Sequence, residues 1–248
     1  MSNTTKRFLM AASGGKKSTY VDDVFSTYVY LGNGANRSIV NGVDNTKGGL
    51  VWTKARTASY EHILVDTERG TNKYLSSNSA DSEVTDAVLT SFNNNGYGLS
   101  GSADVNRHSD YPFVGWNFRK AKGFCDIVTY TGTGSNRTIA HNLGSVPGCM
   151  IIKCTNQSRD WTIYHQGVDP TGNNPEGYRL KFTTAAIQTN ASYWNNTKPT
   201  STHFSLGSSN QVNETGDTYV AYIFAGGAST AATAKSVEFN GSSQSLHM

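Results

Sequence analysis

The chain has 248 residues, with 25 glycines, only 5 prolines and a formal net charge of +3. This length suffices for one large or two medium domains that bury a core without disulfides or metal ions. Because lysine and arginine are scattered singly, there is no basic stripe to follow a phosphate backbone, and we predict no nucleic-acid binding.

Residues 1–21 are predicted to form an extended arm. The apolar run at 8–12 follows two basic residues, and its five residues are too few for a signal-peptide core or a membrane span. We therefore expect no membrane insertion and no export by the usual route. The three cysteines, Cys125, Cys149 and Cys154, are odd in number and lack CxxC spacing, which indicates free thiols in a reducing cytoplasm.

A turn sequence follows the first predicted strand and occurs again in the second half of the chain. Apolar and β-branched residues flank Gly32–Asn36 and Gly132–Asn136, which predicts a hairpin whose positive-φ positions need Gly or Asn. Arg37 and Arg137 come next. A guanidinium there can pin the turn by binding strand-end carbonyls or a neighbouring carboxylate; the alternative is a solvent-exposed arginine.

Residues 74–92 give the best prediction of a helix. Apolar residues at Val84, Ala87, Val88 and Leu89 are spaced suitably, and they follow Ser and Asp residues that can cap a helix. We expect one short helix in the first half of the chain.

The similarity between the two halves extends well beyond the turn. Gly49–Lys54 corresponds to Gly148–Lys153, and a Val-Asn pair followed by an aromatic strand occurs at 105–106 and again at 212–213. The repeat is about a hundred residues long, which is too long for a solenoid unit and typical of a small β-sandwich or of half of a larger one. We therefore predict an internal duplication.

The second half contains the clearest strands. The apolar run 149–152 is bounded by turn signals and is predicted to be a core strand covered on both faces. Segments 161–165 and 219–224 largely alternate apolar with polar or small residues, as expected for strands with one face on a core. The predicted fold is all-β, with two related antiparallel β-sandwich modules at 22–123 and 124–228 and few short helices.

Two aromatic residues are candidates for ligand contact. Tyr193 and Trp194 lie beside Asn195 and Asn196, and we predict that this pair is exposed. Aromatic rings bury the apolar face of a sugar ring well, so the pair is a candidate glycan contact. Most other aromatic residues lie in predicted strands and are assigned to the core.

Local signatures of catalysis are missing from the sequence. The histidines have no HxxxH or HxH spacing, and there is no GxSxG, Walker or Rossmann motif. Asp104 and Asp110 flank His108, but the second copy lacks the histidine, so we interpret this segment as a polar loop. We predict no metal, no cofactor and no enzymatic activity; a glycosidase carboxylate pair needs no local signature and stays open.

Three phrases carry a resemblance to a known family: Tyr20–Thr27, Gly49–Lys54 and Thr138–Gly148. In these, the chain resembles a domain of unknown function found in tail-fibre-like and other virion proteins of marine bacteriophages, including those of cyanobacteria, over roughly residues 22–228. The resemblance implies a structural role in the virion and transfers no catalytic residues. Residues 236–248 resemble the opening strand of a laminin-G or concanavalin-like module, so 229–248 are expected to be a linker and the start of a further module.

Three hypotheses for function follow. The first is an anchoring and assembly module of a tail fibre or head decoration, assembled in the host cytoplasm, bound to other virion proteins and homo-oligomeric, with a trimer favoured by analogy with fibres. The second is a lectin that binds host surface glycan through Tyr193 and Trp194. The third is a polysaccharide depolymerase, for which the sequence offers no identifiable acid and base pair.

Overall fold

The computed structural model describes residues 19–107, 111–169, 171, 173–182 and 186–227. Most of this part of the chain is antiparallel strand, and its helices have three or four residues each, so the predicted all-β class with few short helices is confirmed. The predicted further module at 229–248 lies outside the described residues, as do residues 1–18 of the predicted arm. The helices are α2 (Val21–Val24), η1 (Asn45–Lys47), α3 (Ala103–Asn106), η2 (Pro175–Gly177), α4 (Ala191–Trp194) and α5 (Asn210–Asn213).

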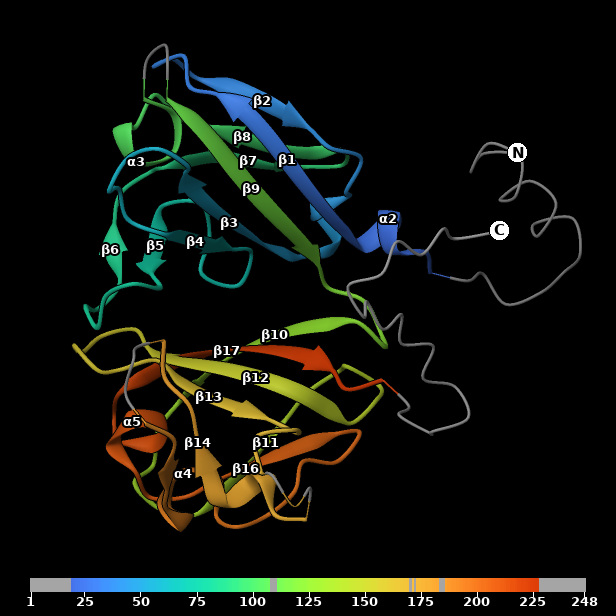
Figure 1. The fold of residues 1–248 in the computed structure, drawn as a ribbon, viewed down its shortest axis with the longest axis vertical. Coiled ribbons are helices and arrows are strands. Elements are labelled where there is room, and N and C mark those ends of the chain that lie inside the picture. The colour runs from blue at the N-terminus through green and yellow to red at the C-terminus, as the bar shows by residue number, and fades with distance from the viewer. Residues whose placement is uncertain (1–18, 108–110, 170, 172, 183–185, 228–248) are drawn as a thin grey trace, which may run out of the picture.

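The first module consists of two antiparallel sheets (Figure 1). The larger sheet has six strands in the order β1 (Phe25–Leu31), β9 (Pro112–Arg119), β3 (Gly49–Ala55), β4 (Ile63–Asp66), β5 (Lys73–Ser76) and β6 (Val84–Thr85). The smaller sheet has the order β2 (Arg37–Val40), β8 (Gly96–Leu99) and β7 (Leu89–Asn93).

The second module repeats this plan. Its main sheet has the order β10 (Cys125–Thr131), β17 (Thr218–Ala225), β12 (Pro147–Cys154) and β13 (Thr162–His165). Two short ladders accompany it: β11 (Arg137–Ala140) with β16 (His203–Leu206), and β14 (Tyr178–Arg179) with β15 (Gln188–Thr189).

The two modules correspond in strand order and in register. In each main sheet the first strand of the module pairs with the last, which then pairs with the third strand of the module. Tyr30 lies opposite Phe113 in the first module, and Tyr130 lies opposite Tyr219 in the second. The correspondence confirms two related β modules from an internal duplication.

The described residues form three apolar cores. The first module lies above the second in Figure 1. One core lies within each module, and the third lies between the two main sheets. Alternate residues of β3 contribute to different cores: Val51 packs in the core of the first module, whereas Leu50 packs in the shared core. In β12, Met150 and Ile152 pack in the second module and Ile151 packs against the shared core, so this strand is covered on both faces as predicted.

Equivalent faces of the two modules meet in the shared core. Phe118 of β9 and Phe224 of β17 occupy equivalent positions, and their rings contact each other edge to face with centroids 5.4 Å apart. Leu50 and Leu64 from the first module pack there with Ile127 and Val220 from the second. Burying side chains of this size contributes about 1.5–3 kcal/mol each, so the interface between modules is a true core.

Two predictions about local structure were wrong. The repeated turn does not close a hairpin, because β1 pairs with β9 while β2 pairs with β8, so the turn joins strands of different sheets. Its predicted positive φ is present at Gly34 and at Gly134.

The predicted helix within 74–92 is replaced by β5, β6 and β7. Backbone bonds to distant segments hold this stretch extended: Glu83 N–H donates to the Thr155 carbonyl at 2.7 Å and Asp86 N–H to the Asn72 carbonyl at 2.9 Å. Val88 and Leu89 are both buried in the first core, Leu89 at the start of β7.

Candidate functional site

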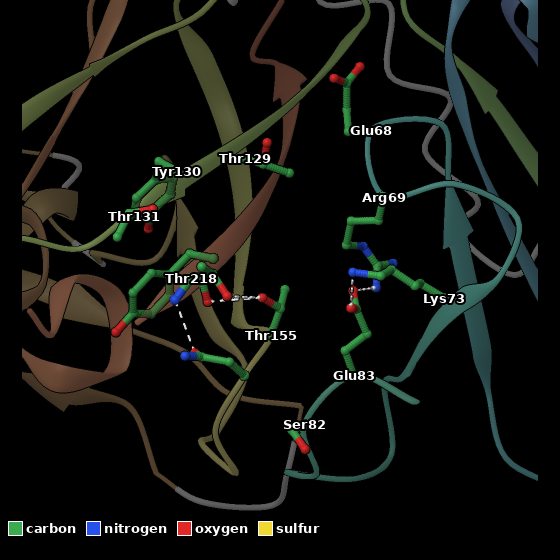
Figure 2. A pocket seen from close by; sticks show the side chains of 12 residues that line it. Glu68, Arg69, Lys73, Ser82, Glu83, Thr129, Tyr130, Thr131, Thr155 and Thr218 are labelled. Carbon is green, nitrogen blue, oxygen red and sulfur yellow. Dashed lines mark hydrogen bonds and ion pairs between the residues drawn. The ribbon is translucent and has the colours of Figure 1, made fainter. Parts of the chain in front are cut away.

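A cleft of about 640 Å³ opens between the two modules (Figure 2). Charged side chains of the first module line one wall, and hydroxyl-bearing side chains of the second module line the opposite wall. The lining residues are Glu68, Arg69, Lys73, Ser82, Glu83, Thr129, Tyr130, Thr131, Thr155, Asn156, Thr218 and Tyr219.

Arg69 is the centre of a buried ionic network in the charged wall. Its Nε donates to Asp66 Oδ2 at 2.7 Å and its Nη1 to Glu83 Oε2 at 3.0 Å. Its Nη2 donates to the hydroxyl of Tyr222 at 3.0 Å and to the carbonyl of Leu64 at 3.2 Å. The Arg69 side chain is only 4% exposed, and each of its three guanidinium nitrogens donates a hydrogen bond inside the protein.

Tyr222 links this network across the two modules. Its hydroxyl donates to Asp66 Oδ2 at 2.8 Å while accepting from Arg69. Burial raises the pKa of Tyr222 well above its ordinary value, with the opposing effect of the Arg69 charge smaller. The hydroxyl therefore stays protonated and continues to donate to Asp66.

The outer charged residues of the cleft are paired as well. Lys73 Nζ lies 2.9 Å from Glu83 Oε1, and Glu68 Oε1 lies 2.7 Å from Nζ of Lys120. Lys120 is also 3.3 Å from Asp126 Oδ1, so this contact joins the two modules. The charged wall contacts the second module through Lys120 and Asp126 and through Arg69 and Tyr222.

The opposite wall presents hydroxyl groups from β10, from β17 and from Thr155, which directly follows β12. Thr129 and Thr131 are exposed on β10. Thr155 Oγ1 lies 2.6 Å from Oγ1 of Thr218 and also contacts the Thr218 carbonyl at 3.1 Å (Figure 2). This wall offers hydroxyl groups for hydrogen bonding.

The predicted exposure of Tyr193 and Trp194 is wrong, because both side chains are buried, at 9% and 1% exposed. Trp194 Nε1 donates to the Tyr178 carbonyl at 2.8 Å, and its ring meets Tyr164 edge to face. The guanidinium of Arg179 lies 4.6 Å from the centre of the Tyr193 ring. The polar neighbours Asn195 and Asn196 suggested exposure, but both adopt positive φ where the chain turns out of α4. Neither ring is available to stack on a sugar.

Arg37 and Arg137 occupy equivalent positions with equivalent contacts. Nη1 of Arg37 donates to the Leu31 carbonyl at 2.7 Å, and Nη1 of Arg137 donates to the Thr131 carbonyl at 2.8 Å. Each arginine thus provides a hydrogen-bond donor for the backbone carbonyl at the end of the strand before the turn. That these bonds stabilise the turn stays a prediction.

Asn106 and Asn213 are structural residues whose role the sequence did not reveal. The side-chain oxygen of Asn213 accepts from Thr133 N–H at 3.0 Å, and its amide donates to the Ser135 and Gly207 carbonyls at 2.7 and 2.8 Å. Asn106 makes the same set of bonds in the first module, accepting from Asn33 N–H and donating to the Ala35 and Ser100 carbonyls. The repeated Val-Asn pair was the available signal.

Within the described ranges, no three His, Cys, Asp or Glu side chains are grouped closely enough to bind a metal ion. Residues 108–110, which include His108, lie outside those ranges, so the interpretation of that segment as a polar loop stays a prediction. No helix in the described part of the chain has the length and apolarity needed to cross a membrane. The three cysteines carry free thiols.

Comparison with known proteins places the chain in a protein family. The model of a family described as a domain of unknown function, DUF7483, matches residues 20–245, which include both β modules. No curated protein and no solved structure matches the chain. The chain therefore belongs to the DUF7483 family.

Proposed function

We propose that this chain is a non-enzymatic structural component of a bacteriophage virion, an anchoring and assembly module of a tail fibre or head decoration. It is assembled in the host cytoplasm and binds other virion proteins. The proposal starts from the resemblance of Tyr20–Thr27, Gly49–Lys54 and Thr138–Gly148 to virion proteins. Analogy with fibres further predicts a homo-oligomer, with a trimer favoured.

The observation that carries the proposal is the pairing of the ionisable groups in the cleft. Arg69, Lys73, Glu68 and Glu83 are each held in an ion pair, as expected for a device that fixes two modules together. A catalytic site instead keeps a base or nucleophile poised for substrate. Two β modules held together in this way suit a component that bears mechanical force in a virion.

Fractionation of phage particles tests the proposal. Virions of the phage that encodes this chain are purified on a density gradient, and peptides of the chain are quantified by mass spectrometry across the gradient. The proposal predicts that these peptides peak with the major capsid protein at a constant ratio. Recovery of the chain only in the soluble lysate would contradict it.

A further inference from the structure

The open edge of β1 carries unpaired backbone groups in a defined pattern. β1 is the outermost strand of the six-stranded sheet, with β9 as its neighbour. Gly32 N–H donates to the Tyr111 carbonyl in line with the β1–β9 ladder, and bonding residues alternate along an antiparallel pair. The backbone groups of Phe25, Thr27, Val29 and Leu31 therefore point away from β9.

Two of these outward backbone groups already have hydrogen-bond partners within the same chain. Phe25 N–H donates to the Val21 carbonyl, and the Leu31 carbonyl accepts from Arg37. The others have no hydrogen-bond partner among the described residues: the carbonyl of Phe25, both groups of Thr27 and of Val29, and the N–H of Leu31. This leaves six open groups arranged symmetrically about Tyr28.

The duplicated strand β10 shows how the same edge is blocked in the second module. Ile127 is equivalent to Thr27, and its N–H donates to Asp126 Oδ1 at 3.0 Å while its carbonyl accepts from Lys120 Nζ at 3.1 Å. Charged side chains on an edge strand are a common protection against pairing with other chains. β1 has no charged residue between Phe25 and Leu31, and its edge has no such protection.

The exposed side chains at two equivalent positions of the edge strands also differ, because those of β1 are apolar and those of β10 are polar. Val29 and Leu31 are 55% and 62% exposed, whereas the equivalent residues of β10 are Thr129 and Thr131. The same backbone register accommodates threonine in the second module, so the fold itself does not require apolar residues at these positions. Their apolar character suits contact with another molecule.

We propose that β1 pairs antiparallel with β1 of a second copy of this chain, around a two-fold axis at Tyr28. In this register, Thr27 of each copy exchanges two hydrogen bonds with Val29 of the other, and each Leu31 N–H donates to the Phe25 carbonyl of the other copy. All six open groups of each edge are satisfied. Phe25 N–H and the Leu31 carbonyl already have hydrogen-bond partners within their own chain. They are the two groups that would otherwise face each other between the paired strands.

This self-complementary edge favours a second copy over an unrelated strand. The absence of charge along β1 means that no like charges meet when two copies approach. The contact is two-fold, so it predicts a dimer in place of the trimer expected by analogy with fibres. It deepens the proposed homo-oligomeric assembly by naming the surface involved.

Sedimentation velocity of the full chain tests the proposal, with the duplication as an internal control. Edge pairing buries less area than a standard interface, so we expect dimers to form with a Kd in the micromolar range. Val29→Pro removes an outward N–H that has no partner within the described chain, and should weaken dimerisation at least about tenfold. Thr129→Pro makes the equivalent change on β10 and should leave the Kd unchanged.

A pair of lysine variants covers the case in which either proline variant fails to fold by circular dichroism. Val29→Lys places a charge on the open edge and should also prevent pairing, whereas Thr129→Lys should not. Dimers that respond equally to the changes on β1 and β10 would overturn the proposal. So would a wild-type chain that stays monomeric at the highest concentration, or one that forms trimers.

Disulfide trapping tests the register. Tyr28 faces its own equivalent in a non-hydrogen-bonded pair, for which the Cα atoms are about 4.5 Å apart, within the range that a disulfide spans. Tyr28→Cys should give covalent dimers under mild oxidation, whereas Val40→Cys, at an exposed position of β2, should match the wild-type background. An equal yield from both variants would contradict the register. If the chain dimerises through β1 but is absent from purified virions, the edge-pairing inference holds and only the proposed virion function is contradicted.

Discussion

At the scale of single residues, two equivalent asparagines join the repeated turn to the short helix before the last strand of each module. Asn106 and Asn213 are both fully buried, and each uses its oxygen and its amide nitrogen. Since a buried polar group that loses its partners is costly, the side chains act as internal supports of the turns. Shared contacts of this kind are strong evidence that the two modules had a common origin.

Replacing either asparagine should destabilise the protein by a similar amount. Asn106→Ala and Asn213→Ala each leave several backbone groups of the turn without a partner, so we expect a loss of about 1–3 kcal/mol in the free energy of unfolding for each. Urea denaturation measures this loss. Asn94→Ala, at an exposed turn position with negative φ, serves as a control with a smaller effect. A loss below about 0.5 kcal/mol at both buried sites would refute the supporting role.

Lys153 predicts a pH-dependent contribution to stability. Its side chain lies between the modules, where Nζ donates to the carbonyls of Ala80 and Cys154 at 3.0 Å each. Burial lowers the pKa of Lys153 from 10.5 to about 8. The unfolded chain therefore keeps this proton to higher pH than the folded chain does, and the contribution of Lys153 to stability rises between about pH 8 and 10.

The comparison of wild type with Lys153→Met isolates this effect, because other titrating groups are common to both proteins. The unfolding free energy of wild type minus that of the variant should be constant below pH 7 and then rise by up to about 1.4 kcal/mol per pH unit above pH 8. Denaturant titrations at several pH values give the difference. A difference that is flat or falls above pH 8 would show that the lysine is not desolvated.

At the scale of elements, the segment from β4 to β5 and the strand β17 form a buried polar link between the modules. Asp66 ends β4, Arg69 follows in the turn, and Tyr222 reaches them from β17. Removing one member of a buried network leaves the others without compensation. The link therefore depends on all three residues.

Tyr222→Phe should destabilise the protein by about 1–3 kcal/mol, because Asp66 and Arg69 both lose a buried hydrogen bond. Tyr178→Phe is the matched control, since the Tyr178 hydroxyl makes no hydrogen bond within the described residues. Guanidinium denaturation of both variants gives the comparison. Equal stability of the two would mean that the network does not join the modules energetically.

Sequence patterns identified the elements that depend on local chemistry and missed those decided by distant contacts. The run 149–152 and the segment 219–224 became core strands because their apolar pattern matches burial on the sheet faces. The spacing of apolar residues within 74–92 resembled a helix, but backbone bonds to segments such as Thr155 decided the outcome. Trp194 was misassigned for the same reason: the residues that cover it, Tyr164 and Tyr178, are distant in sequence.

At the scale of the whole molecule, the shared core makes one structure of two similar modules. Buried residues of both modules pack together around Phe118 and Phe224, and the ion pairs of Lys120 and Arg69 flank them. The cleft itself was not predictable from the sequence, because its walls come from segments far apart in the chain that only folding brings together.

The shared core predicts cooperative unfolding of the two modules. Exposing one face of it on unfolding of a single module would uncover apolar residues of the other, so both should unfold together. Scanning calorimetry should give one transition with equal calorimetric and van't Hoff enthalpies. Two resolved transitions would show that the modules are independently stable.

A cryo-electron microscopy reconstruction of the phage particle tests the proposed role most directly. It should contain density at a repeated position on the tail or head surface that fits both modules, with their main sheets packed face to face through Phe118 and Phe224. Particles without such density, or with the two modules separated, would contradict a paired β unit that serves as a structural part of the virion.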